Sequence, residues 1–556
     1  MKLKNIDIKM YNVGFGDCFL LQFHYVSPES KKSVCIDFGS LDTTDQQMKQ
    51  IARNLLSHLD KDKKSGKPVL DLLVITHEHK DHISGFKQAE DELSDLIINE
   101  LWFSWTEDEK HPFSADWKEN QANDRKKLRQ IQKEIQGVAQ LNSLSGFLTN
   151  MLNFEADADL NYREGFGKNE IFEKIKKKVP NKKNILYHRP GALGTETGKT
   201  GKPICTIPGI NIYVLGPPED FKYLRKEDSR KKNELYIQAD YTGDFSFTQS
   251  IAFDEKEKNF WDYVRAAPFD EEYIIPIDVK NAKTGIGNLS KSTSTPISQK
   301  LENQNKKLEK TDVYKSYFGT TPKSSNQNQN WRRIDYDWLQ VVDGLALELN
   351  NHINNTSLVL AFEIEQTGEV MLFSGDAQYG VWLAWDDDLK NHQEYLQTEG
   401  KKENPHSYNR TYSWSRKDKK GKVATIHVED LLARTILYKV GHHGSHNATP
   451  DRTGLSKLTS NALLALISVS PRSQWPSIPY ANLLDAFDKR KVRYFRSDDT
   501  NLHSVPQCWK ADTIVSVEYQ NTVKYQNDVE NQDTKENAVS YLSCKLTITK
   551  PENTPA

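Results

Sequence analysis

Short apolar runs that each end in a potential metal ligand recur along this sequence, and they constrain the fold more than any other feature. In the clearest case, residues 70–75 (LDLLVI) lead directly into residues 76–82 (THEHKDH). The run has the length and composition of a buried strand. The metal-ligating side chains that follow it are His77, His79, Asp81 and His82. Imidazole and carboxylate groups favour zinc, and these four can converge on one or two cations only if the chain turns sharply after the strand.

Three other segments repeat this arrangement. Asp37 closes an early strand, Asp376 follows the apolar residues 370–373, and His442 and His443 follow residues 436–440. In a layered α/β protein functional residues gather at strand ends, so we expect these distant segments to meet. Taken alone, two of these segments also have a simpler interpretation. Asp376 could be an ordinary turn residue, and residues 76–82 could be a solvated loop that is rich in histidine.

Composition gives no support for a membrane or a strongly charged partner. The chain has 75 basic and 77 acidic residues, a net charge of −2, so its overall field attracts neither nucleic acid nor membrane. Its 5 cysteines show neither a C-x-x-C pair nor the spacing of a disulfide framework. There is no apolar signal core near the start, and no run of about 18 apolar residues that could span a membrane. These observations predict a cytoplasmic protein.

The pattern of apolar residues predicts an α/β fold interrupted by polar segments. A helix is expected over residues 46–59, after three strands, and further strands at 210–215, 357–363, 463–469, 513–519 and 539–549. Residues 124–144 carry a helical apolar seam that would cover the core or pair with a partner helix. Residues 173–183 hold a run of lysines typical of a solvated face. Residues 331–338 interleave aromatic and basic groups, which fits either nucleic-acid stacking or ordinary packing at a helix start.

The segment HEHKDH matches the H-x-H-x-D-H signature of the metallo-β-lactamase superfamily. The chain more closely resembles the hydrolase domain at the C-terminus of competence-type DNA-uptake channel proteins. Residues 12–18 (NVGFGDC), 355–360 (NTSLVL) and 437–445 (LYKVGHHGS) carry this resemblance. It implies an αββα sandwich with large insertions. The implied divisions are a first half of the core at 1–105, a helical lysine-rich insertion at 106–203, a core strand at 204–218, a polar insertion at 219–353, a second half of the core at 354–510 and a C-terminal β-hairpin extension at 511–556.

The resemblance also implies roles for the ligand-type residues. His77 and His79 would hold one zinc ion, Asp81 and His82 the other, and Asp376 would bridge them, with Mn²⁺ as the alternative metal. His442 is the preferred further ligand, ahead of His443. Asp37 would orient ligand imidazoles, and Asp17 would either do the same or act as a structural cap in a glycine-rich turn. Residues close enough to contact an anionic substrate are Lys439, Ser445, His446 and Asn447.

This chain departs from the related domains in two places. It has residues 474–477 (QWPS) where they have a Gly-His-Pro segment, and it lacks a clear counterpart of the superfamily's middle ligand histidine. His188 is the best-placed candidate for that position.

We therefore expect a hydrolase in which metal-activated hydroxide cleaves a phosphodiester, that is, a nuclease or other phosphodiesterase acting on nucleic acid or a nucleotide. A free-standing enzyme of this kind suggests an effector in bacterial defence. The fold alone does not select the bond, so a lactonase or esterase acting on a small molecule is one alternative. Another is a non-catalytic metal-binding subunit whose protein partner docks on the insertions.

Overall fold

The computed structural model describes residues 2–26, 29–135, 168–191, 202–226, 351–398, 411–417, 422–470, 477–498, 505–510, 513–522 and 539–548, with isolated positions at 142, 145, 146, 148, 149, 152 and 349. The chain divides into two compact units. The first contains Met1–Gln121, Asn153–Thr242 and Glu348–Ala556, and the second contains Ala122–Leu152 and Gly243–Leu347. Every element described below belongs to the first unit, except that the boundary falls inside α4 (Ser114–Ile135).

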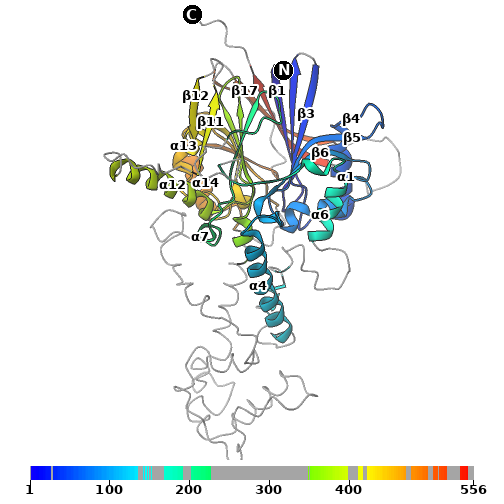
Figure 1. Ribbon diagram of the computed structural model, residues 1–556. Helices are drawn as coiled ribbons and strands as arrows, with labels where there is room; N and C mark the ends of the chain where they lie inside the picture. Colours follow the sequence, from blue (N-terminus) through cyan, green and yellow to red (C-terminus); the bar gives the residue numbers. More distant parts are fainter. Residues whose placement is uncertain are drawn as a thin grey trace, which may run out of the picture. The chain divides into compact units, whose positions relative to one another are not determined.

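Two large mixed sheets form the centre of the first unit (Figure 1). The strand order of the first sheet is β16-β17-β18-β1-β2-β3-β5-β6-β7, with β4 paired to β5. Its strands are β1 (Leu3–Tyr11), β2 (Phe19–Val26), β3 (Glu29–Ile36), β4 (Asp60–Lys61), β5 (Pro68–Val74), β6 (Ile97–Ser104), β7 (Ile185–His188), β16 (Val505–Lys510), β17 (Thr513–Thr522) and β18 (Val539–Ile548). Neighbours from β3 through β5 and β6 to β7 are parallel, so the C-terminal ends of these strands share one edge.

The second sheet has the order β15-β14-β13-β10-β9-β8. Its strands are β8 (Ile210–Gly216), β9 (Val359–Ile364), β10 (Val370–Phe373), β13 (Thr435–Lys439), β14 (Leu464–Ile467) and β15 (Arg493–Arg496). The neighbours β10, β13, β14 and β15 are parallel, whereas β8, β9 and β10 pair antiparallel. A separate antiparallel pair contains β11 (Ser413–Lys417) and β12 (Val423–His427).

Alternating side chains place the two sheets face to face. On β9, Leu360 and Phe362 enter a core that also contains Leu72 and Val74 of the first sheet. The intervening β9 residues Val359 and Ala361 join a different core on the outer face. Since successive residues of a strand point to opposite faces, each sheet contributes one face to the shared core and covers the other with helices.

Helices cover both outer faces (Figure 1). The first sheet packs against α1 (Asp45–Ser57), α3 (Gly85–Gln88) and α6 (Lys168–Lys177), and the second against α12 (Tyr379–Thr398), α13 (Val428–Ala433) and α14 (Ala481–Lys489). The helix α1 begins at a capping box made by Thr44 and Gln47, and its apolar stripe is buried. The expected mixed α/β class is confirmed, and its described layers run helix, sheet, sheet, helix.

The structure refines several sequence expectations. The predicted helix over 124–144 begins earlier, at Ser114, and is described as far as Ile135. The strand β18 pairs with β1, so the last described strands extend the first sheet. In the lysine-rich run, Lys174 pairs with Glu170 and Glu90 at the surface, as a solvated helix face would. The segment 331–338 and most of 219–353 lie outside the described residues. Among the described helices, none has the length and apolar character needed to cross a membrane.

Candidate metal centre

The sharp turn after β5 forms as the sequence predicts. Ile75 N–H still donates to the carbonyl of Trp102 on the neighbouring strand, but His79 adopts an extended backbone and precedes the short helix α2 (Lys80–Ile83). This turn buries Asp81 and His82, which are 1% and 0% exposed. Both side chains are therefore held at the shared strand edge.

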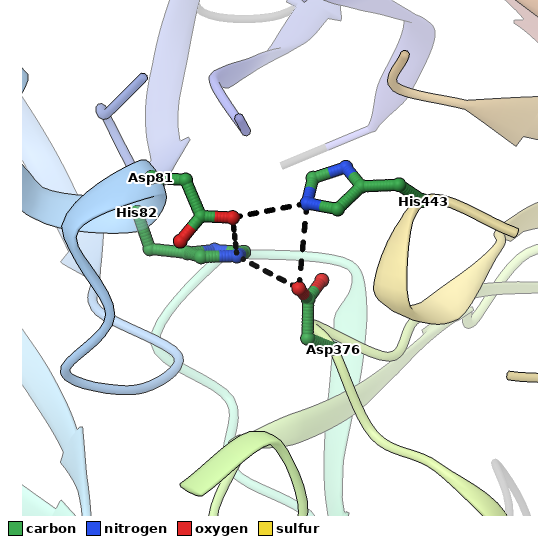
Figure 2. A group of neighbouring side chains, drawn as sticks. All are labelled: Asp81, His82, Asp376 and His443. Carbon is green, nitrogen blue, oxygen red and sulfur yellow. Dashed lines mark hydrogen bonds and ion pairs between the residues drawn. The ribbon is translucent and has the colours of Figure 1, made fainter. Parts of the chain in front are cut away.

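Four buried side chains meet at this edge: Asp81, His82, Asp376 and His443 (Figure 2). The Nε2 atom of His443 lies 3.1 Å from Asp81 Oδ2 and 3.4 Å from Asp376 Oδ2. The Nε2 atom of His82 lies 3.2 Å from Asp376 Oδ2 and 3.6 Å from Asp81 Oδ2. Tetrahedral zinc with bonds of about 2.1 Å needs ligand atoms about 3.4 Å apart. The cluster therefore fits a single divalent cation.

Two hydrogen-bonding observations support this fit. The buried atoms His82 Nε2 and Asp376 Oδ2 make no hydrogen bond within the described structure. The other nitrogen of each cluster imidazole is already engaged: His82 Nδ1 lies 2.8 Å from Asp37 Oδ2, and His443 Nδ1 lies 2.9 Å from the carbonyl oxygen of Ser468. A carbonyl accepts only, so His443 carries a proton on Nδ1, and when the ring is neutral its Nε2 presents a lone pair to the cluster.

Asp37 positions His82 through a constrained backbone. Its φ is 56°, a left-handed conformation uncommon outside glycine and asparagine. One carboxylate oxygen accepts a hydrogen bond from the backbone N–H of Thr76 at 2.8 Å. The other accepts a hydrogen bond from the Thr76 hydroxyl at 2.6 Å and also faces His82. The carboxylate thus joins the end of β3 to the turn after β5.

The Asp376 segment depends on a close approach that only glycine allows. Gly375 has a φ of 53°, and a Cβ there would lie 2.9 Å from both Ser357 Cβ and Thr76 Cβ. Asp376 N–H then donates to the Ser357 hydroxyl at 2.9 Å. These contacts bring the ends of β10 and β5 together and aim Asp376 at the cluster.

Lys439 is part of the protein interior, which corrects its expected contact with substrate. The side chain is about 1% exposed, and Nζ donates to the carbonyl of Gly375 at 2.7 Å, to Asp376 Oδ1 at 3.1 Å and to Asp17 Oδ2 at 2.5 Å. All three ammonium protons therefore have acceptors. Since Oδ1 of Asp376 faces this cation, only Oδ2 remains for metal ions, and the bridging of two ions by Asp376 stays a prediction.

The charges of the cluster balance within the buried site. Burial opposes charge on His82, but the carboxylates of Asp376, Asp81 and Asp37 prevail and raise its pKa well above the ordinary value. Burial also tends to lower the pKa of His443, but the carboxylate of Asp376 outweighs this effect and raises it. Burial also opposes charge on Asp376, but His82 and Lys439 hold its pKa well below its usual range. The metal-free cluster is therefore a compact network of ion pairs.

The first pair of motif histidines lies beside this cluster but does not join it. His77 Nε2 is 3.0 Å from His79 Nδ1, and the ring of His77 is 4.1 Å from that of His82. Burial lowers the pKa of His77 well below its usual value and that of His79 to about 4. Both rings are neutral at neutral pH, as ligands must be, but among the described residues they are not members of a group of three or more metal-ligating side chains.

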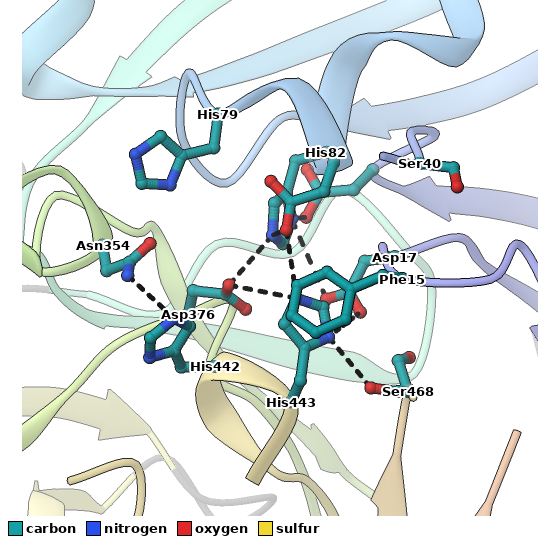
Figure 3. Close-up of polar contacts among 12 residues, drawn as sticks. Phe15, Asp17, Ser40, His79, His82, Asn354, Asp376, His442, His443 and Ser468 are labelled. Atoms are coloured by element: carbon teal, nitrogen blue, oxygen red, sulfur yellow. Dashed lines mark hydrogen bonds and ion pairs between the residues drawn. The ribbon is translucent and has the colours of Figure 1, made fainter. Parts of the chain in front are cut away.

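His443, rather than the preferred His442, reaches the cluster (Figure 3). Both residues have left-handed backbones, with φ of 41° and 53°. Their side chains consequently point in different directions, and His442 contacts Gln378 Nε2 at 2.7 Å and Asn354 Nδ2 at 3.2 Å. Our expectation ranked rigidity by distance from the strand end and did not foresee this backbone reversal. No sequence signal marked Gln378 or Asn354.

The remaining candidates occupy other surroundings. His188 ends β7, with its ring 4.3 Å from that of Trp102, and it is not among the clustered residues.

Ser445 and Asn447 are buried and hydrogen-bonded to each other at 2.9 Å, so they support the loop around His442. The ring of His446 lies 6.2 Å from that of Tyr480. Asp17 lies 3.8 Å from His82 Nδ1 and, with Asp37 and His82, forms a second group of metal-ligating side chains.

Comparison with protein-family models and with curated proteins found no match for this chain.

Replacing Asp37 with asparagine should weaken metal binding by about 10–100-fold, the usual effect of removing a group that orients a ligand imidazole. Asparagine tolerates the left-handed backbone at this position, but it removes the negative charge facing His82 and replaces one of the two accepting oxygens with an NH2 donor. Competition with a chromogenic chelator measures the affinity. Asp91→Asn is the matched control, because the Asp91 side chain is 87% exposed. Equal affinities in the two variants would contradict this role.

Binding of zinc at pH 7.5 should release protons. Coordination needs neutral imidazoles, whereas the metal-free protein raises the pKa of both His82 and His443. The ion-pair stabilisation from these groups is complete below the ordinary histidine pKa of about 6.5 and is lost as pH rises through their raised values. Titration calorimetry in buffers of different ionisation enthalpy measures the release. A binding enthalpy that is the same in every buffer would contradict the raised pKa values.

Proposed function

We propose that the protein is a metal-dependent hydrolase of the metallo-β-lactamase type that cleaves phosphodiesters in nucleic acid or nucleotides. The observation that carries the proposal is the cluster of Asp81, His82, Asp376 and His443, assembled from three separate strand ends. The helix, sheet, sheet, helix layering and the HEHKDH segment support the same assignment. The choice of a phosphodiester as the bond that is cleaved rests on the resemblance of residues 355–360 and 437–445 to the hydrolase domain of DNA-uptake channel proteins.

The residues of the site have distinct parts in this proposal. Asp81, His82, Asp376 and His443 would hold the ion. Asp37 and the Ser468 carbonyl hold the proton of each cluster imidazole on Nδ1, which leaves Nε2 free to coordinate. Lys439 offsets the charge of Asp17 and Asp376. A bound Zn²⁺ or Mn²⁺ lowers the pKa of water and stabilises charge on a leaving oxygen. His77 and His79 offer neutral nitrogens for a second, weaker ion.

One observation favours a second candidate, a non-catalytic metal-binding subunit. Four protein ligands complete a tetrahedral zinc site, and closed sites of this kind are usually structural. All four are buried here. The neutral pair His77 and His79 beside the cluster favours the hydrolase, because a structural ion needs no such neighbours.

Activity assays separate these functions. The protein loaded with zinc or manganese should cleave a chromogenic phosphodiester, DNA or RNA, and EDTA or Asp81→Asn should stop the reaction. Turnover of a chromogenic lactone without phosphodiester cleavage would select the lactonase. A metal-loaded protein with neither activity would overturn the hydrolase and leave the structural role.

A further inference from the structure

A second site lies at the strand edge beyond the metal cluster. It is a cavity of about 330 Å³, lined by residues at or just after the ends of β6 and β7 and by residues of β8. None of the four clustered residues lines it. Ser104 of β6 pairs with His188 of β7, while β6 also pairs with β5, whose end leads into the metal motif. Two strand spacings, about 10 Å, therefore separate β7 from β5.

The walls of this cavity are aromatic and apolar. Trp105, Tyr187 and Trp414 line it together with Ile212 and Val214. The indole N–H of Trp105 is already bonded to the carbonyl of Pro217 at 3.0 Å, and the side chains of Trp105 and Trp414 are each only 1% exposed, so the partly exposed Tyr187 offers most of the accessible aromatic surface. Aromatic rings of this kind bind planar molecules by stacking or edge contacts.

One buried polar atom in the wall lacks a partner. His188 is 6% exposed and lines the cavity, and its Nε2 makes no hydrogen bond with the described residues. Burial lowers the pKa of His188 to about 4, so the ring is neutral at neutral pH and can donate from one nitrogen and accept at the other. Buried polar atoms are rarely left unpaired, and a ligand with a polar edge would satisfy this one.

The mouth of the cavity is positively charged. Lys110, Arg189 and Lys202 line it, against a single acidic lining residue, Asp108. Arg189 pairs with Glu219 at 3.2 Å, whereas Lys110 and Lys202 are exposed and form no ion pair within the described part of the chain. Two lysines are thus placed to receive an anionic group.

We propose that this cavity binds a planar aromatic ring that carries an anionic group, in the size range of a nucleoside monophosphate. The ring would lie against Tyr187, a polar edge would meet His188 Nε2, and the anion would pair with Lys110 and Lys202. The volume falls within the range of small-molecule sites. This binding goes beyond the proposed hydrolysis, since it uses none of the metal-ligating residues.

Calorimetry on the EDTA-treated full-length protein tests the proposal without any turnover. The probes are AMP, CMP and 4-hydroxybenzoate, with adenosine and inorganic phosphate as the separate parts. We expect saturable binding of one ligand per chain, at least about tenfold tighter for an intact probe than for either part. Nucleotide binding would assign the anion to a phosphate, and preferred binding of 4-hydroxybenzoate would assign it to a carboxylate.

Variants locate the binding. Lys110→Glu combined with Lys202→Glu should weaken it at least about tenfold, whereas Lys183→Glu, a single charge reversal at an exposed position that does not line the cavity, should not. His188→Phe keeps an aromatic ring beside Trp102 and removes the nitrogen, and it should also weaken binding about tenfold. No saturable binding of any intact probe at millimolar concentration, or equal weakening by Lys183→Glu, would overturn the proposal. A failure of the hydrolase assays would leave this result unaffected.

Discussion

Asp376→Asn should lower the kcat/KM for phosphodiester cleavage by at least about a hundredfold. The cation's Lewis-acid contribution is worth several kcal/mol, and each 1.36 kcal/mol corresponds to about a factor of ten in rate. Asparagine keeps the size of the side chain but removes the negative charge that faces His82 and His443. Steady-state kinetics on a chromogenic phosphodiester, at matched metal concentration, measures the change.

The control for this substitution is Asp91→Asn, at an exposed carboxylate. It should retain full activity. Circular dichroism confirms that both variants fold. Wild-type rates in Asp376→Asn would place the chemistry away from this cluster.

Lys439→Met should destabilise the fold by about 3–5 kcal/mol, the usual cost of leaving a buried charge without its partner. Lys439 is the cation between Asp17 and Asp376, and the side chains of all three are at most 2% exposed. Methionine fills similar space but leaves the buried Asp17 without its nearest cation and leaves Asp376 with only His82 and His443. Urea denaturation of metal-free protein measures the loss in free energy of unfolding.

A double variant makes this prediction specific. Adding Asp17→Asn to Lys439→Met removes the charge that has lost its nearest cation and should recover about 1 kcal/mol or more, since residues in one network couple by about 0.5–3 kcal/mol. The exposed Lys183→Met should change stability by at most about 0.5 kcal/mol. A Lys439→Met variant as stable as Lys183→Met would show that the buried network contributes little.

The strand ends were predictable because local sequence determines them. The apolar runs 70–75 and 370–373 form β5 and β10 within two residues of their expected bounds, and Asp376 follows its strand as expected. Parallel neighbours β10 and β13 bring Asp376 and His443 to one edge of the second sheet, whereas Asp81 comes from the first sheet and meets them because the two sheets pack face to face.

The direction of individual side chains was not predictable in the same way. His442 and His443 are adjacent and chemically identical, and only the left-handed backbone at both positions sends His443 to the cluster. Lys439 looked like a substrate contact because its neighbours are ligands, yet strand β13 buries it beneath Asp376. The cavity around His188 depends on β7 and β8, which come from different sheets, and no local pattern reveals it.

The metal content of single-residue variants tests the central claim most directly. Native mass spectrometry after dialysis should find one tightly bound divalent ion per chain in the wild type. We expect His79→Gln to retain this ion and both Asp376→Asn and His443→Gln to lose it, because the four clustered side chains hold it. An ion that persists in His443→Gln and disappears in His79→Gln would contradict this account.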